Sequence, residues 1–154
     1  MDNIVVNEKG ILKLLEDLKP NKATGPDSIP AFLLKIGAEE LSPVLKRLFL
    51  LSINQGQVPK EWKEAWVTPI FKKGDKHQPA NYRPVSLTSI VCKILEHIIN
   101  SNIMNHLDRL KILTDAQHGF RKSRSCETQL IVTVHDIAKC LADGDQGPVS
   151  YTRS

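Results

Sequence analysis

Cysteine is scarce in this sequence of 154 residues, and it is not arranged to bind metal. The three cysteines, Cys92, Cys126 and Cys140, lie far apart, and no two of them form a C-x-x-C pair. An odd number of isolated cysteines excludes the usual zinc sites and disulfide frameworks, so we expect reduced thiols in an intracellular protein. The histidines also lack a metal-ligand spacing, and the sequence predicts no metal site.

Long apolar runs and aromatic residues are also few. No apolar run approaches the roughly 20 residues that cross a membrane. The N-terminus, MDNIVVNEKG, carries an acidic residue early and lacks the apolar core of a signal peptide. We therefore expect no membrane partner, and a location in the cytoplasm or the nucleus rather than secretion. Aromatic residues make up only 5%, which argues against a surface that binds nucleic acid mainly by stacking.

The residues that are present describe one globular domain. Apolar residues make up 41% of the chain and charged residues 25%, which is typical of a chain that folds around a core. The net charge of +4 favours an anionic partner only weakly, because many proteins of this charge bind no polyanion. The placement of the charge is therefore more informative than its sum.

Apolar periodicity and turn residues predict an α+β fold with several helices and one antiparallel hairpin. The expected elements are a helix capped by Asn7, a short helix in PAFLLKIG, a helix closed by Gly56, strands in AWVTPIF and YRPVSL, and two further helices capped by Ser89 and Ser125, the last of them ended by Gly144. The last helix has an apolar stripe that we expect to be buried, formed by Leu130, Val134, Ile137 and Leu141.

Positive charge is concentrated at two places. The segment from residue 72 to residue 83 holds three lysines and Arg83 against a single acid, Asp75. The segment from residue 121 to residue 124 holds Arg121, Lys122 and Arg124 with no acid between them. Arginine and lysine at a hairpin can hold phosphate oxygens. They can also do no more than keep a hairpin tip soluble, and charge alone favours this second interpretation.

Four longer motifs occur in a fixed order, and their combination is more specific than any one of them. They read NKATGPDSIP, WKEAWVTPIFKKGD, NYRPVSLTSIVCKILE and LTDAQHGFRKSRSCETQL. This series resembles the start of the reverse transcriptase domain of non-LTR (LINE-type) retrotransposons, and the resemblance extends from Ile11 to Asp145. It implies the right-hand polymerase architecture of fingers, palm and thumb, with residues 1–145 as a partial domain that holds the helix-rich fingers and the approach to the palm. Residues 146–154 do not match the family, and we expect this chain to lack the palm sheet and the thumb.

The resemblance also implies roles for particular residues. Lys73 and Arg83 match positions in the fingers that contact the triphosphate of an incoming dNTP, and Lys72 is the neighbouring alternative. The residues expected to contact template or other nucleic acid are Gln117, Gly119, Phe120 and Arg121 of the QxGFR motif, Lys122 and Arg124 beside it, and Lys22 before the Gly25-Pro26-Asp27 turn. For that turn, a simple connection between two helices is an alternative.

The sequence departs from the family at the catalytic carboxylates. The family holds two Mg²⁺ ions on palm aspartates, from an F-x-D strand and a Y-x-D-D turn, and neither motif occurs in these 154 residues. Asp143 and Asp145 fit an exposed turn better than a metal site. We therefore expect a fragment of an RNA-directed DNA polymerase, inactive alone, whose full-length form uses Mg²⁺, dNTP, an RNA template and a DNA primer. The alternatives are a catalytically dead RNA- or DNA-binding module and a degenerate retroelement product without a function.

Overall fold

The computed structural model describes residues 4–142 of the chain. The chain divides into two compact units, Met1–His106 and Leu107–Ser154. The described residues do not include Asp143, Gly144, Asp145 or the non-matching tail 146–154, so the expectations about them are not addressed by the structure.

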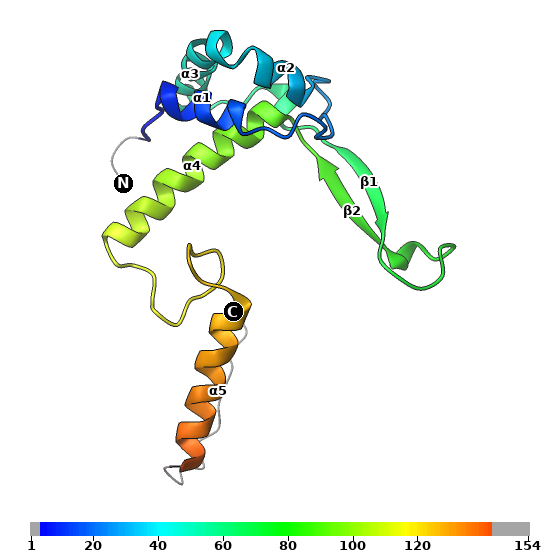
Figure 1. Cartoon of the computed structure of the whole chain (residues 1–154). Coiled ribbons are helices and arrows are strands. Elements are labelled where there is room, and N and C mark those ends of the chain that lie inside the picture. Colours follow the sequence, from blue (N-terminus) through cyan, green and yellow to red (C-terminus); the bar gives the residue numbers. More distant parts are fainter. Residues whose placement is uncertain (1–3, 143–154) are drawn as a thin grey trace. The chain divides into compact units, whose positions relative to one another are not determined.

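The first unit is built on four helices whose ends follow local sequence signals (Figure 1). They are α1 (Glu8–Glu16), α2 (Ala31–Ile36), α3 (Ala38–Gln55) and α4 (Ile90–Arg109), the last of which continues into the second unit. The side chain of Asn7 accepts a hydrogen bond from the N–H of Lys9 and caps α1. Gly56 ends α3 in the left-handed conformation, with φ 63°. Both predicted signals are confirmed.

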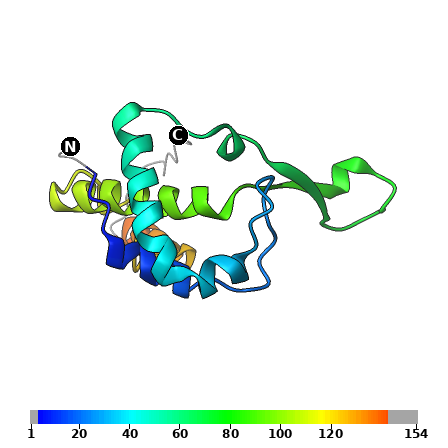
Figure 2. The same cartoon turned by 90° about the horizontal axis from the view of Figure 1, so that it is seen from above.

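The core of the first unit lies between α1, α3 and α4. It contains Ile11 and Leu15 of α1, Phe49 of α3 and Ile90 of α4, all of them at most 1% exposed. Helix α3 packs on α1 and crosses α4 when the unit is seen from above (Figure 2). In α4 the buried residues lie between Ile90 and Ile98, because only this part of the helix is covered by the other two. The core therefore holds the N-terminal part of α4 in place.

The two predicted strands are present and form an antiparallel hairpin. Strand β1 (Trp66–Phe71) pairs with β2 (Tyr82–Leu87), and Pro69 lies opposite Pro84. Short 3₁₀ turns precede each strand, at Lys60–Trp62 and Pro79–Asn81. This sheet has two strands and hence two edges, so both prolines lie on edge strands, where proline is tolerated. The mixture of helices and a small antiparallel sheet confirms the α+β fold class.

The turn at Gly25-Pro26-Asp27 is more than a connection between two helices. Its predicted turn is confirmed, because the N–H of Ser28 donates to the carbonyl of Gly25 at 3.0 Å. Gly25 is buried, and a Cβ atom placed on it would lie 2.5 Å from the backbone of both Thr88 and Ser89. The backbone of the turn therefore packs directly against the junction between β2 and α4, which only glycine permits.

The second unit consists of an irregular loop followed by α5 (Cys126–Ala142). The predicted cap is confirmed, because the N–H of Thr128 donates to Oγ of Ser125 at 3.2 Å. The predicted burial of the apolar stripe on this helix is wrong, since none of its described residues is buried. Leu130, Val134 and Leu141 are each more than half exposed. A lone helix and a loop supply no second layer of secondary structure against which the stripe could pack.

Membrane insertion by a helix finds no support in the described residues. Between residues 4 and 142, no helix combines the length and the apolar character that a membrane-spanning helix requires.

Candidate nucleic-acid interface

The hairpin presents four cations that no acidic residue between residues 4 and 142 neutralises. Lys72, Lys73, Lys76 and Arg83 are all exposed. None of them forms a salt bridge with any residue in the described part of the chain. Unpaired ammonium and guanidinium groups at one end of a hairpin create a positive potential that attracts phosphate.

The single acid of this segment is used to build the loop. The carboxylate of Asp75 accepts the N–H of His77 at 2.9 Å, and its carbonyl accepts the side-chain amide of Asn81 at 2.8 Å. The hydroxyl of Tyr82 donates to the carbonyl of Lys76 at 2.9 Å. Gly74 has φ 91°, and a Cβ there would approach the Asn81 side chain to 2.8 Å. The loop is therefore braced from within, which holds the lysines at the tip without pairing their charges.

The register of the strands separates the cations by face. Arg83 lies opposite Ile70, and successive side chains of a strand point to opposite faces. The N–H of Lys72 still donates to the carbonyl of Asn81 at 2.8 Å, so the alternation continues one residue beyond β1 and places Lys72 on the same face as Arg83. The Nζ atom of Lys76 lies 5.7 Å from the centre of the Phe71 ring, which belongs to the opposite face. Two of the three residues expected to bind a triphosphate thus share one face.

Lys22 lies at the other end of the hairpin. It is exposed and precedes the turn that packs, through Gly25, against Thr88 and Ser89 at the end of β2. The strands have six residues each and so separate the two ends of the hairpin by about 20 Å. The structure therefore does not gather Lys22 with the cations at the tip.

In the second unit, the two arginines of the basic cluster are occupied by intramolecular contacts. Arg124 donates to the carbonyl of Asp115 and forms a salt bridge with its carboxylate at 2.8 Å. Arg121 donates to the carbonyl of Thr114 at 2.9 Å and lies 3.6 Å from the carboxylate of Asp108. Their side chains are only 24% and 18% exposed. These arginines hold the loop together, a role that the sequence reasoning missed because the acidic partners lie outside the cluster.

The remaining residues of the QxGFR region face solvent. Gln117, Gly119, Phe120 and Lys122 are exposed, and Phe120 is 101% exposed with φ 59°. A fully exposed aromatic ring in the left-handed conformation is uncommon for a bulky residue and marks a shape imposed by the rest of the loop. No atom lies within 4 Å of a Cβ placed on Gly119, so its own unit leaves space on that side. The loop thus offers an aromatic ring beside one unpaired lysine.

His118 also belongs to this loop, although it was not among the predicted site residues. Its Nδ1 lies 2.9 Å from Oγ1 of Thr128, in the first turn of α5. Together with Phe120 and Arg124 it lines a shallow hollow of about 320 Å³. Its contact attaches the loop to the start of the helix.

Between residues 4 and 142, the chain does not bring together the ligands of a catalytic metal. Within the described residues, no group of three or more histidines, cysteines, aspartates or glutamates is placed to hold an ion. The carboxylates near the cations, Asp75, Asp108 and Asp115, serve loop contacts instead. The described residues therefore do not fit the pair of Mg²⁺ ions that the family uses, and no step of a reaction follows from them.

Comparison with known proteins finds related polymerases of mobile elements. No family model matches the chain. The probable RNA-directed DNA polymerase from transposon BS of Drosophila melanogaster is 29% identical over 130 residues, which cover 84% of this chain and 14% of that protein. The probable RNA-directed DNA polymerase from transposon X-element of the same fly is 30% identical over 118 residues, or 76% of this chain and 13% of that protein. The RNA-directed DNA polymerase from mobile element jockey, also of Drosophila melanogaster, is 28% identical over 121 residues.

These similarities confirm the resemblance that the motifs predicted. They extend over most of the chain at modest identity, so the chain is homologous to a region of non-LTR retrotransposon RNA-directed DNA polymerases. The chain spans only about 13–14% of the length of these curated relatives.

Proposed function

We propose that this chain, as a homologue of non-LTR retrotransposon RNA-directed DNA polymerases, is the fingers portion of such an enzyme and binds nucleic acid and the incoming nucleotide. The observation that carries the proposal is the hairpin tip, where exposed cations have no acidic partner in the described residues. Polymerisation, Mg²⁺ and the primer belong to the longer protein in this proposal. Residues 1–145 are the proposed partial domain.

In the proposed role, Lys73, Arg83 and Lys72 contact the triphosphate. Negative charge builds up on the leaving pyrophosphate during nucleotide transfer, and cations held in place beforehand stabilise that charge at little reorganisation cost. The internal bracing of the loop by Asp75 and Tyr82 fits this role, because it fixes the backbone that carries the cations. The arginine fork and the lysine ammonium groups suit phosphate oxygens in general, so the same face can hold a nucleic-acid backbone.

The loop of the second unit is proposed to contact the template. Gln117, Gly119, Phe120 and Lys122 supply its exposed surface, and Phe120 offers a ring on which a base can stack. Arg121 and Arg124 act in this proposal as positioning residues, because their side chains are committed to Asp108 and Asp115. Lys22 is proposed to contact nucleic acid separately, at the base of the hairpin.

Binding of a short single-stranded RNA across a series of salt concentrations tests the proposal. Of the seven cations in the two basic segments, Lys76, Arg121 and Arg124 are assigned to internal contacts, which leaves Lys72, Lys73, Arg83 and Lys122. With about 0.7 counterions released per phosphate contact, log K should fall against log salt with a slope of about −3. The double substitution Lys73→Ala and Arg83→Ala should reduce the slope to about −1.4.

A control variant of the same charge uses Lys9→Ala and Arg47→Ala. Both residues are exposed on helices of the first unit, and neither side chain has a partner in the described part of the chain, so the net charge changes equally while the hairpin is unaltered. This control should keep the parent slope. If both double variants bind with the same affinity and slope, the attraction comes from net charge alone and the proposed site is wrong.

The alternative of a catalytically dead binding module has one observation in its favour. The described residues contain cations suited to phosphate but no cluster of carboxylates that could hold a metal. It predicts the same salt dependence for RNA. The binding module differs from the polymerase fragment because it predicts that dNTP has no effect on RNA binding. Competition between dNTP and RNA for Lys73 and Arg83 would therefore favour the polymerase fragment.

A further inference from the structure

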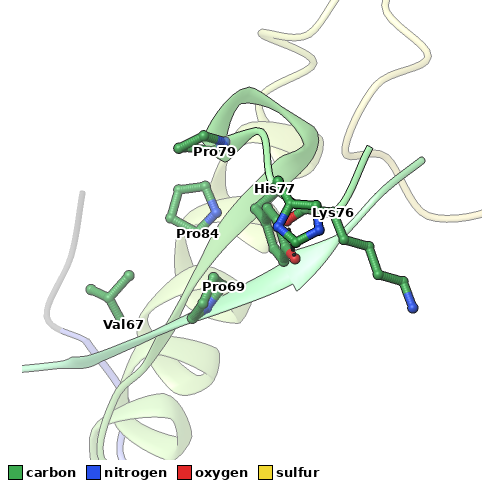
Figure 3. A pocket seen from close by; sticks show the side chains of 7 residues that line it. Val67, Pro69, Lys76, His77, Pro79 and Pro84 are labelled. Carbon is green, nitrogen blue, oxygen red and sulfur yellow. Dashed lines mark hydrogen bonds between the residues drawn. The ribbon is translucent and has the colours of Figure 1, made fainter. Parts of the chain in front are cut away.

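The hairpin has a second surface, on the face opposite Arg83, that the proposed nucleotide site does not use. Here Val67 and Pro69 of β1 and Pro84 of β2, together with Pro79, form the apolar wall of a groove of about 690 Å³ (Figure 3). Lys76 and His77 of the loop line the groove as well. This surface, the proline face, is solvent-exposed along most of its length.

We propose that the proline face docks an acidic peptide segment of a partner protein, with a large apolar side chain of that segment held in the groove. The proposal does not rest on the nucleotide site, because the register places Arg83 on the other face of the hairpin.

The edges of the hairpin are blocked against pairing with another strand. In antiparallel strands, pairs of residues that hydrogen-bond to each other alternate with pairs whose N–H groups point outward. Lys72 and Asn81 form a pair of the first kind, because the N–H of Lys72 donates to the carbonyl of Asn81. Pro69 and Pro84, three pairs further on, form an outward-pointing pair. Proline has no N–H, so each outer edge lacks the donor at its middle. A partner must therefore bind the face of the hairpin rather than extend its sheet.

The walls of the groove suit an apolar side chain better than a nucleobase. The two aromatic rings of this face, Phe71 and Tyr82, are packed edge to face with their centroids 5.5 Å apart. The Lys76 ammonium lies over the Phe71 ring, and the Tyr82 hydroxyl is bonded to a backbone carbonyl. The rest of the wall is made of proline rings and valine. Because base stacking needs a free aromatic face, a side chain such as leucine or phenylalanine is the better occupant.

The positive charge near the groove favours acidic residues on either side of the apolar side chain that the groove holds. Lys76 lines the groove itself, and the carboxylate of Asp75, the one acid of the loop, already accepts the N–H of His77. Lys72 and Arg83 lie on the other face and add only to the general positive potential of the hairpin. Carboxylates on either side of the apolar anchor would be attracted to this potential. A second copy of this chain would not be, since its net charge is +4.

Nuclear magnetic resonance of the isotope-labelled 154-residue chain with synthetic peptides tests the proposal. The probes are an acidic apolar hexapeptide, Glu-Glu-Leu-Phe-Glu-Glu, its charge-reversed form, Lys-Lys-Leu-Phe-Lys-Lys, and an acidic form without the anchor, Glu-Glu-Ser-Gly-Glu-Glu. We expect saturable shifts at Val67, His77 and Tyr82 with the first peptide only. Either absent shifts with the first peptide or equal shifts with all three would overturn the proposal.

Two substitutions provide a matched pair. Val67→Glu places a carboxylate in the groove and should weaken binding of the first peptide at least 10-fold. Val85→Glu adds the same charge on the other face, at a position that is 37% exposed, and should leave binding unchanged. Equal loss in both variants, displacement of the peptide by a ten-nucleotide oligouridine, or shifts that depend on protein concentration without peptide would each overturn the proposal. The three peptides with the unsubstituted chain decide the question even if a variant fails to fold.

Discussion

At the scale of single residues, Gly25 connects two distant parts of the chain through backbone packing. A methyl group at this position would lie 2.5 Å from Thr88 and Ser89 backbone atoms, which cannot rotate away as a side chain can. We expect Gly25→Ala to lower the free energy of unfolding by roughly 1–3 kcal/mol, because the turn and the start of α4 must separate. Urea denaturation followed by circular dichroism measures the change.

Gly10→Ala is the matched control for this substitution. Gly10 lies within α1, and a Cβ there meets only the Cβ of Asn7, at 3.8 Å. Alanine is favoured over glycine in a helix by roughly 0.5–1 kcal/mol, so this variant should be more stable than the parent. A Gly25→Ala variant that is as stable as the parent would show that the turn can shift freely.

Cys92 is a second residue whose environment can be tested, through the reactivity of its thiol. Burial, reinforced by the carboxylate of Glu96 that its thiol contacts at 3.5 Å, raises the pKa of Cys92 from 9.0 to about 11. The thiolate is the reactive form, so at pH 8 iodoacetamide should label exposed Cys126 and leave Cys92 unmodified in the folded chain. Peptide mass spectrometry measures the two rates, and equal labelling of both cysteines would contradict the burial of Cys92.

The same pKa gives a dependence of stability on pH. The thiol of Cys92 ionises near pH 9 in the unfolded chain and near pH 11 in the folded chain, so folding retains the proton. Its contribution is therefore fully present below pH 9 and is lost as the pH rises from 9 to 11. Replacing Cys92 with alanine should make the urea midpoint less sensitive to pH in that range.

At the scale of elements, the ends of the helices could be predicted from sequence because their causes are local. Asn7, Ser89 and Ser125 each bond to a backbone N–H within three residues, and such caps have a sequence signature. The pairing of Arg121 and Arg124 with acids elsewhere in an irregular loop has no such signature. Likewise, apolar periodicity predicted the helix of α5 but could not show whether another element covers it.

Substitution of the two hairpin prolines tests whether they prevent the edges of the hairpin from pairing with another strand. The double substitution Pro69→Thr and Pro84→Thr adds one outward N–H to each edge and replaces a poor strand residue with a good one. We expect the variant to associate at protein concentrations at which the parent does not, since each edge becomes continuous. Light scattering with size-exclusion chromatography over a concentration series measures the association.

Val85→Thr is the control for that experiment. It places threonine in the same strand, opposite Thr68, where the N–H already points toward the partner strand. Its association should match that of the parent. If the double proline variant also stays unassociated over the whole concentration range, other features protect the edges of the hairpin.

At the scale of the whole molecule, the core is unevenly distributed between the two units. All buried apolar residues of the described chain lie between Val6 and Ile98, within the first unit. Helix α5 has none, and the contacts that shape its unit are loop hydrogen bonds and salt bridges to the exposed carboxylates of Asp108 and Asp115. Exposed ion pairs contribute little stability, whereas each buried side chain of the core contributes roughly 1.5–3 kcal/mol. The two units should therefore differ widely in resistance to opening.

Hydrogen exchange of the whole chain, read by mass spectrometry, measures this difference. Amides of α4 between Ile90 and Ile98 should exchange only through global unfolding, because they lie in the core. Amides of α5 should exchange through local opening. Their protection should therefore not follow changes in the global stability of the chain. The Gly25→Ala substitution separates the two cases, since it should speed exchange in α4 and leave α5 unaffected. Protection of α5 equal to that of α4, lost in parallel in the variant, would instead show that its exposed apolar stripe is covered in solution, by the first unit or by a second copy of the chain.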